Sequence, residues 1–367
     1  MQNNLPNEWN LESLLTLTYI KGMSYAEHKK IVERYSSYAE FISNAFNVKQ
    51  GEFFADIHTN SQNIENAKKQ VDFCYENQIS IVTIFDENYP NLLKNIASPP
   101  TILFVRGKLQ NPDAISISVV GTRKCTTYGK LATEMFVSEF IDNNLIVTSG
   151  LAYGIDSHVH QTAIKKNGIT YSVIASGIDK ILPQTSKKLA DEIVETGGAI
   201  ISEYKCGTMA LQGYFPQRNR IISGISRATL VIESAIKGGS LITARFAFDQ
   251  GREVFAVAGN ITSEKSEGCN SLIRSNAAAI AVSPQTMLQD LGLTELPFEK
   301  TQVKEITFNS KEEELIYNIL STEPIHIDSI PQLTNLDISE ILVILLEMEF
   351  NGQIKQLPGK YYIKSRL

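Results

Sequence analysis

The stretch SISVVGTRKCTTYGKLATEMFVSEFI, residues 116–141, decides how the middle of this 367-residue chain folds. Residues 116–120 carry small or apolar side chains at every position, which is typical of a strand buried on both faces of a sheet. A glycine-containing turn follows, and the run from Lys130 has the three- and four-residue apolar spacing of a helix. The stretch therefore predicts one strand–turn–helix unit of an α/β sheet.

The same order of elements repeats over residues 79–284. Strand-like apolar runs occur at residues 79–85, 116–121, 145–150, 170–176, 199–204, 228–234, 253–259 and 278–282. Amphipathic stretches such as KKLADEIVETG (187–197) and SLITARFAFDQG (240–251) separate most of them. Alternation of this kind predicts the α/β class, as an extended Rossmann-like, doubly wound parallel sheet with helices on both faces.

Two smaller modules flank this region. Short amphipathic runs between residues 11 and 75 predict a small helical domain of the SAM or helix-hairpin-helix type, and the turn IKGMS in it is either structural or a phosphate contact. From residue 310, three helical runs and two short strands around Pro358-Gly359 predict a winged helix. The expected domains are residues 1–78, 79–284 and 309–367, with a linker at 285–308.

Composition narrows the class of protein. The longest apolar runs fall short of the 18 residues that a membrane helix needs, and the N-terminus lacks the pattern of a secretion signal. The four cysteines are scattered and form no CxxC pair, so free thiols in a reducing compartment are expected, without a disulfide framework or a zinc site. We therefore expect a cytoplasmic protein that uses no metal.

Charge is distributed unevenly along the chain. The net charge is −6, but residues 81–284 contain 20 basic and 17 acidic residues, whereas residues 285–367 contain 7 basic and 13 acidic. A site for a polyanion is therefore expected in the middle of the chain. The third helical run of the winged helix, DISEILVILLEMEF (337–350), has no Lys or Arg. Because DNA-reading helices need basic side chains, we expect this tail to bind protein and not DNA.

Glycines follow five of the predicted strands, at the sheet edge where parallel α/β folds bind ligands. They lie in the turns GTR (121–123), GLAYGID (150–156), SGID (176–179), KGGS (237–240) and GN (259–260). Glycine lets a ligand approach the backbone, and each helix that follows offers unpaired N–H groups to an anion. Any one of these glycines can be merely structural, but five along one edge favour a phosphate-binding surface.

The stretch FPQRNRIISGIS, residues 215–226, adds cations to this edge. We expect Pro216 to end an extended segment and Arg218, Asn219 and Arg220 to lie at the head of the next helix. Cations there oppose the helix dipole unless an anion lies between them. The alternative is a pair of solvated surface arginines. Phe215 either belongs to the core or stacks on a base, and single-stranded nucleic acid suits both the arginines and the phenylalanine.

Motifs of familiar enzymes are missing. The sequence contains no GxGxxG, GxxxxGK[ST], GxSxG or HExxH. His158 and His160 are two residues apart on a predicted helix, so they point to different faces and are not a ligand pair. Asp156 is expected to anchor a loop or cap a helix. No catalytic residue and no cofactor are therefore predicted.

Seven blocks together resemble the DNA processing protein A family (DprA, also called Smf). They are VGTRKCTTYG, SGLAYGIDSHVH, VIASGIDKILPQTSKKLADEI, ISEY, FPQRNRIISGIS, KGGSLITARFAFDQGREVFAVAGNI and GCNSLIRSNAA, within residues 80–282. The resemblance implies a protein that binds and protects single-stranded DNA during natural transformation and loads the recombinase RecA onto it. It also implies a homodimer formed through the Rossmann-like domain, and no enzymatic activity.

The resemblance also implies which residues hold the strand. Arg123 would hold a backbone phosphate, with Lys187 near the same groove. The full predicted set is Gly121, Thr122, Arg123, Gly150, Gly154, Ser176, Gly177, Lys187, Phe215, Arg218, Asn219, Arg220, Ser240 and Thr243. Tyr153 departs from the pattern, because a basic residue is common there.

Two other functions are weighed against strand binding. One is a Rossmann-like nucleotide N-glycosidase of the lysine-decarboxylase-like type, but Arg245 stands where its GGxGTxxE loop has a carboxylate. The other is a scaffold whose glycine turns are only structural.

Overall fold

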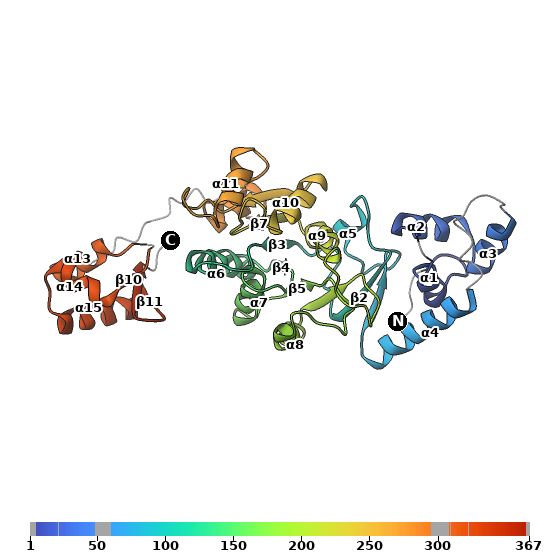
Figure 1. Cartoon of the computed structure of the whole chain (residues 1–367), viewed down its shortest axis with the longest axis horizontal. Helices are drawn as coiled ribbons and strands as arrows, with labels where there is room; N and C mark the ends of the chain where they lie inside the picture. The colour runs from blue at the N-terminus through green and yellow to red at the C-terminus, as the bar shows by residue number, and fades with distance from the viewer. Residues whose placement is uncertain are drawn as a thin grey trace. The chain divides into compact units, whose positions relative to one another are not determined.

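The computed structural model describes residues 5–20, 22–47, 60–294, 308, 310–321 and 323–364. The chain forms two compact units, Met1–Thr294 and Glu295–Leu367 (Figure 1). Each unit has its own buried core. The predicted boundary between residues 78 and 79 falls inside the first unit and stays a prediction.

A nine-stranded sheet forms the centre of the first unit, in the order β1-β2-β6-β5-β4-β3-β7-β8-β9. The strands are β1 (Ser80–Thr83), β2 (Ile102–Gly107), β3 (Ser116–Val120), β4 (Ile146–Ser149), β5 (Thr170–Val173), β6 (Ala199–Ser202), β7 (Ala228–Val231), β8 (Glu253–Ala256) and β9 (Ala279–Ile280). From β6 to β9 all neighbours are parallel, as predicted. The sequence prediction missed β2, which pairs antiparallel with β1 and β6. The pattern that predicts the sheet is an alternation of parallel strands and helices, and β2 does not fit it.

Helices cover both faces of this sheet (Figure 1). One layer contains α6 (Thr127–Asp142), α7 (Ile155–Lys165), α8 (Lys187–Glu195) and α12 (Pro284–Asp290). The other contains α5 (Asn91–Lys94), α9 (Tyr214–Gly224), α10 (Ser240–Asp249) and α11 (Glu267–Arg274). Met287 and Leu288 of α12 are buried against the sheet. The first residues of the proposed linker therefore belong to the first unit.

Four helices precede the sheet and pack on the end that carries β1. They are α1 (Leu11–Leu17), α2 (Tyr25–Arg34), α3 (Tyr38–Asn47) and α4 (Asn60–Glu76). Their apolar side chains join a core that includes Phe104 of β2 and Leu189 of α8. The Cys74 and Cys206 sulfur atoms lie 3.7 Å apart across this contact, and both cysteines are free thiols. Lys21, in the predicted IKGMS turn, lies outside the described residues.

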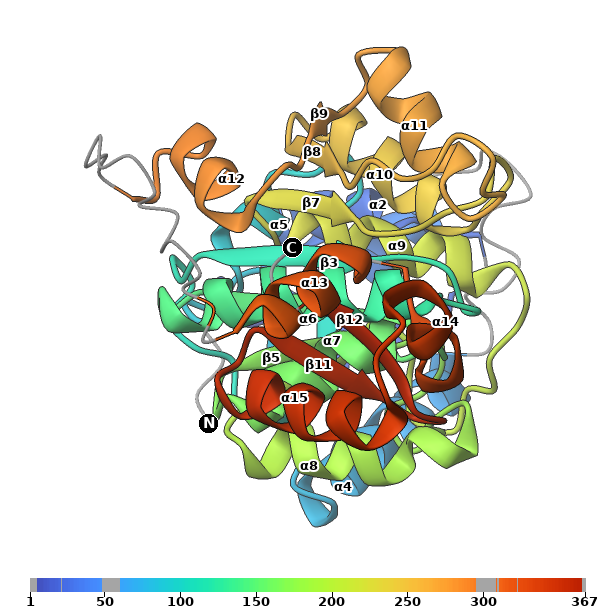
Figure 2. The ribbon, with the colours of Figure 1, turned by 90° about the vertical axis from the view of Figure 1, so that its left-hand side faces the viewer.

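The second unit is built from three helices and a small antiparallel sheet (Figure 2). Its elements are α13 (Lys311–Ile319), β10 (Ile325–His326), α14 (Ile330–Thr334), α15 (Ile338–Phe350), β11 (Ile354–Leu357) and β12 (Tyr361–Lys364). The Asp337 side chain caps α15 by accepting from the Ser339 N–H, as the sequence predicts. In the described ranges no single helix is long and apolar enough to cross a membrane, although Ile327–Thr334 and Ile338–Phe350, bent by 112°, reach that length and composition together.

The turn between β4 and α7 requires glycine at position 154. Gly154 has φ +81°, and a Cβ there would collide with the carbonyl oxygen of Thr122 and lie 2.6 Å from the carbonyl carbon of Arg123. Backbone atoms cannot move aside as a flexible side chain can. The close approach therefore ties the turn after β4 to the turn after β3.

We predict that Gly154→Ala lowers the free energy of unfolding of the first unit well beyond the effect of Gly207→Ala. Gly207 has a similar φ of +87° but open space around it, so this control carries the backbone strain alone, about 1–3 kcal/mol. Urea unfolding of the full chain, followed by the fluorescence of the single tryptophan, Trp9, measures both variants. Equal losses would show that the two turns are not in forced contact.

Candidate functional site

A groove of 690 Å³ opens at the carboxyl ends of β3 and β7. The chain runs from β3 to β4 on one side, while β7 lies on the other, so this is the point where the strand order reverses. Ligands of open α/β sheets bind at such a switch point. The groove is lined by Val120, Gly121, Thr122, Arg123, Ala152, Asp156, Gln212, Phe215, Pro216, Arg218, Asn219, Ile222, Ala235, Gly238, Gly239, Ser240, Ile242 and Thr243.

A smaller hollow of 210 Å³, here called the apolar bay, adjoins the groove. The two share the residues Arg123, Ala152, Phe215 and Arg218. The rest of the bay is lined by Leu151, Tyr153, Ile174, Ala175, Leu182 and Pro183. The arrangement therefore places two guanidinium groups between a polar groove and a mostly apolar hollow.

Arg123 extends from a turn that is fixed by its neighbours. The Thr122 N–H donates to the Glu233 carbonyl at 2.8 Å, and the Thr122 carbonyl accepts from the Ile155 N–H at 3.2 Å. Arg123 itself is exposed, with its guanidinium carbon 5.7 Å from the centre of the Phe215 ring. A cation stacked on an aromatic face keeps its in-plane N–H groups free for a phosphate.

Arg218 differs from Arg123 because it is buried, with 6% of its surface exposed. Its Nη1 donates to the Val173 carbonyl, and its Nε donates to the Asn219 side chain at 3.2 Å. Burial lowers the pKa of Arg218 to about 10, although the Asp156 carboxyl opposes that shift. Arg218 therefore stays charged at neutral pH and supplies a fixed positive charge to the wall of the groove.

The Asp156 carboxyl interacts with that charge, and both groups lie beside Gly150. Burial raises the pKa of Asp156 to about 6, against the opposing effects of Arg218, of hydrogen bonds to Ala152 and Ser149, and of Arg123. The expectation that Asp156 anchors a loop agrees with these bonds. Its pKa near neutrality makes the charge of the groove depend on pH, which the sequence did not suggest.

The predicted position of the arginines in their helix is wrong. Helix α9 begins at Tyr214, so Pro216 lies in its first turn and Arg218 follows in its second. A proline is tolerated in a first turn because the N–H it lacks has no helical acceptor there. The dipole argument for an anion therefore fails, and the case for one rests on the groove that Arg123 and Arg218 share.

Helix α10 brings a different kind of anion contact. It begins at Ser240 after Gly238-Gly239, and no side chain caps it. Ser240 and Thr243 line the groove, with the Ser240 hydroxyl bonded to the Ser234 hydroxyl at 2.9 Å. The uncapped N–H groups and the positive end of the helix dipole favour a negative ligand here.

The structure brings eight of the fourteen predicted residues to the groove: Gly121, Thr122, Arg123, Phe215, Arg218, Asn219, Ser240 and Thr243. Gly150 and Gly154 do not line the groove, but each lies against residues that do. A side chain at Gly150 would meet Asp156 and the Arg218 guanidinium. The Gly150 carbonyl accepts from Nε2 of the buried His160 at 2.6 Å, so His160 is a structural histidine.

Four predicted residues lie away from the groove and the bay. Ser176 donates to the Lys180 carbonyl, and the Gly177 N–H donates to the Thr208 carbonyl. Lys187 is exposed at the start of α8 but lines neither hollow. The Arg220 guanidinium pairs with the buried Glu203 and lies 5.5 Å from the centre of the Tyr25 ring. Arg220 thus links α9 to the N-terminal helices. A contact of these four residues with single-stranded DNA stays a prediction.

Glu233 is a residue of the site that sequence reasoning missed. Its carboxylate is buried and accepts from both the backbone N–H and the hydroxyl of Thr126. Together with the bond to Thr122, these contacts hold the Arg123 turn at both ends. The only signal in the sequence is a glutamate directly after an apolar strand, in ATLVIES.

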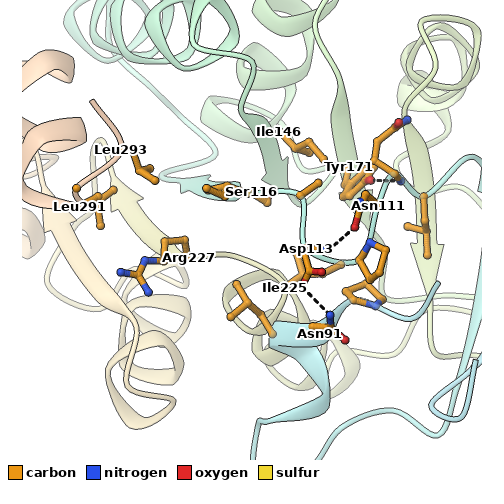
Figure 3. Close-up of a pocket in the computed structure, with 18 residues that line it drawn as sticks. Asn91, Asn111, Asp113, Ser116, Ile146, Tyr171, Ile225, Arg227, Leu291 and Leu293 are labelled. Carbon is orange, nitrogen blue, oxygen red and sulfur yellow. Dashed lines mark hydrogen bonds between the residues drawn. The ribbon is translucent and has the colours of Figure 1, made fainter. Parts of the chain in front are cut away.

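A second pocket lies at the opposite edge of the sheet (Figure 3). It is lined by residues at the amino ends of the strands, such as Ser116 and Ile146, and has a volume of 380 Å³. Asn91 donates to Asp113 there, and Tyr171 accepts from the Gln110 N–H. Its lining has one cation, Arg227, and one carboxylate, Asp113, whereas the groove has two guanidinium groups and one carboxylate. The carboxyl edge is therefore the better anion site.

Among the described residues, no group of three or more His, Cys, Asp or Glu could hold a metal ion. Arg245 is exposed and pairs with Asp249, outside the groove. The chemistry that the groove offers is therefore the binding of an anion by guanidinium, hydroxyl and backbone N–H groups, next to apolar surface.

A family model for DNA recombination-mediator protein A matches residues 80–292, and one for the DprA winged helix domain matches residues 305–360. Protein Smf of Escherichia coli is 36% identical over 285 residues, which is 75% of each chain. DNA processing protein DprA of Streptococcus pneumoniae is 38% identical over 208 residues, 57% of this chain and 73% of that protein.

Solved structures agree with the sequence matches. The X-ray structure of DprA from Streptococcus pneumoniae has a TM-score of 0.57 at 30% identity and covers 79% of this chain and 94% of its own. A Helicobacter pylori DprA structure, described in terms of its single-stranded DNA binding mode, has a TM-score of 0.53 at 27% identity, over 58% of this chain and 95% of its own. The chain therefore belongs to the DprA/Smf family of DNA recombination-mediator proteins.

Proposed function

We propose that this protein binds single-stranded DNA in the groove, with Arg123 on a backbone phosphate and a base in the apolar bay. One observation carries the proposal: Arg123, Phe215 and Arg218 line both hollows, so charge and apolar surface meet along one wall. An unpaired strand has a charged backbone and exposed bases at every nucleotide, whereas paired bases cannot reach a side hollow. The Helicobacter pylori relative, whose structure concerns single-stranded DNA, supports the same ligand.

We further propose that the protein acts as a homodimer in the cytoplasm, by binding and without catalysis, and that it passes the strand to the recombinase RecA. Support for the dimer comes from β9, an edge strand of the sheet. Ile280 and Val282 on this edge are 47% and 65% exposed. An unpaired apolar edge of this kind favours pairing with a second chain. The family membership supports the handover to RecA.

The first prediction concerns Arg123. Replacing Arg123 with Ala should weaken the binding of oligothymidine about tenfold or more, because one phosphate loses its guanidinium partner. The slope of log K against log salt should become shallower by about 0.7, the value for one phosphate of a single strand. Fluorescence anisotropy over a salt series measures both quantities.

The matched control is Arg274→Ala, at an exposed arginine in the last turn of α11. It removes the same charge from the whole protein but should leave the slope unchanged. A slope that is unaltered in Arg123→Ala, or altered equally in both variants, would contradict a phosphate contact at Arg123.

The second prediction concerns Phe215. If a base stacks in the bay, Phe215→Ala should cost about 1–3 kcal/mol of binding free energy, and Phe215→Tyr should cost little. An oligomer of abasic sites should bind the wild type at least as weakly as oligothymidine binds Phe215→Ala, and should not distinguish the two proteins. Isothermal titration calorimetry of the four pairs gives this cycle, and a Phe215→Ala loss that persists on the abasic strand would show that Phe215 acts by supporting Arg123 or the fold and not by stacking on a base.

The third prediction concerns pH. Phosphate in the groove disfavours the ionised form of Asp156, so binding takes up a proton, and affinity should fall as pH rises through about 6. The pKa of His160 is lowered to about 4 by burial, so this histidine stays neutral over that range. Thymine and phosphodiesters do not titrate there either.

Oligothymidine affinity measured between pH 5 and pH 7.5 should thus change severalfold in the wild type. It should be nearly flat in Asp156→Asn, whereas His158→Gln, one turn into the same helix, should keep the wild-type profile. A profile that Asp156→Asn leaves intact would assign the dependence to another group.

A further inference from the structure

Helix α15 of the second unit is apolar on two opposite faces. One face carries Ile341, Leu345 and Met348, which are buried in the core of the unit. Successive helical residues turn by about 100°, so Leu342 and Leu346 point to the other side. There Leu342, Val343, Leu346 and Phe350 are 46%, 57%, 69% and 92% exposed. These four residues are called the outer face of α15.

The outer face continues into a separate hollow beside the wing, which is the hairpin formed by β11 and β12. Leu342, Val343 and Leu346 line a hollow of 410 Å³ together with Ile327 and with Gln356, Lys360 and Tyr362 of the wing. Figure 2 shows α15 running alongside β11. A surface helix of a globular protein normally has one apolar face, and a contiguous exposed apolar patch on a second face marks an interaction site.

The charges around the outer face select the kind of partner. Glu340, Glu347 and Glu349 lie on the same helix, which has no Lys or Arg. Residues 285–367 as a whole contain 13 acidic and 7 basic residues. Lys360 is the one cation among the residues that line the hollow, so the three glutamates leave the rim acidic on balance, and DNA and anionic lipid would be repelled. A second copy of the unit would bring glutamates against glutamates, and like charges across an interface disfavour the pairing.

We propose that the outer face of α15 docks a protein partner whose apolar patch is edged by Lys and Arg side chains. The apolar contact supplies the attraction, and the glutamate rim sets the selectivity for a basic edge. The proposal does not rest on strand binding in the first unit, since it concerns residues of the second unit alone.

Two synthetic helices serve as probes for this surface. Both present a leucine face, with lysines along its edges in one and glutamates in the other. Fluorescence anisotropy of each labelled peptide against the full-length chain should show binding of the leucine–lysine helix at least tenfold tighter than that of the leucine–glutamate helix.

Variants locate the contact. Leu346→Ser should weaken the leucine–lysine helix at least tenfold, whereas Leu333→Ser, at an exposed leucine of α14 outside the hollow, should leave it unchanged. The double variant Glu340→Lys/Glu347→Lys should reduce or reverse the preference between the two peptides. Glu349 is kept, because its carboxylate accepts from the Gln356 N–H.

Several outcomes would overturn the proposal. Equal binding of both peptides would remove the charge selection, and equal loss in Leu346→Ser and Leu333→Ser would remove the site. Sedimentation that shows self-association lost in Leu346→Ser would make a second copy the occupant. Binding to phosphatidylglycerol vesicles that Leu346→Ser abolishes would make the occupant a lipid surface.

Discussion

The hydrogen bonds of Thr122 are the constraint on which the rest of the site depends. Its N–H donates to the Glu233 carbonyl at the end of β7, and its carbonyl accepts from Ile155 at the start of α7. One peptide segment therefore joins the turns after three strands at the switch point of the sheet. With Thr122 fixed in this way, the next side chain, Arg123, lies in the groove and stacks on Phe215.

In the proposed binding of an anion, Arg123 and Arg218 have different roles. Arg218 is buried, bonded to the Val173 carbonyl and close to Asp156, so its charge is fixed in place but partly offset. Arg123 is exposed, and among the described residues that line the groove its recorded contact is with the Phe215 ring. An exposed guanidinium of this kind suits the rapidly exchanging phosphate contacts that the proposed strand binding requires. The buried pair sets the shape and potential of the wall.

Most strands of the sheet, and the edge where the groove lies, could be predicted from the sequence. The features that were missed have physical reasons. The period of the apolar runs predicted the parallel strands, and the glycine turns pointed to the sheet edge where the groove lies. Strand β2 was missed because it pairs antiparallel with both of its neighbours and so lies outside the alternation of parallel strands and helices. The stretch RNR alone does not show that Arg218 and Arg220 have different roles. Only the fold shows that one faces Asp156, while the other pairs with Glu203, which lies 17 positions earlier in the chain.

The central claim is that the groove at the switch point receives the backbone of an unpaired strand. A crystal structure of the chain with a short oligothymidine tests it most directly. The account predicts a phosphate within hydrogen-bonding distance of the Arg123 guanidinium and a thymine against the Phe215 ring. A well-ordered strand elsewhere on the protein, with the groove between β3 and β7 left empty, would contradict it.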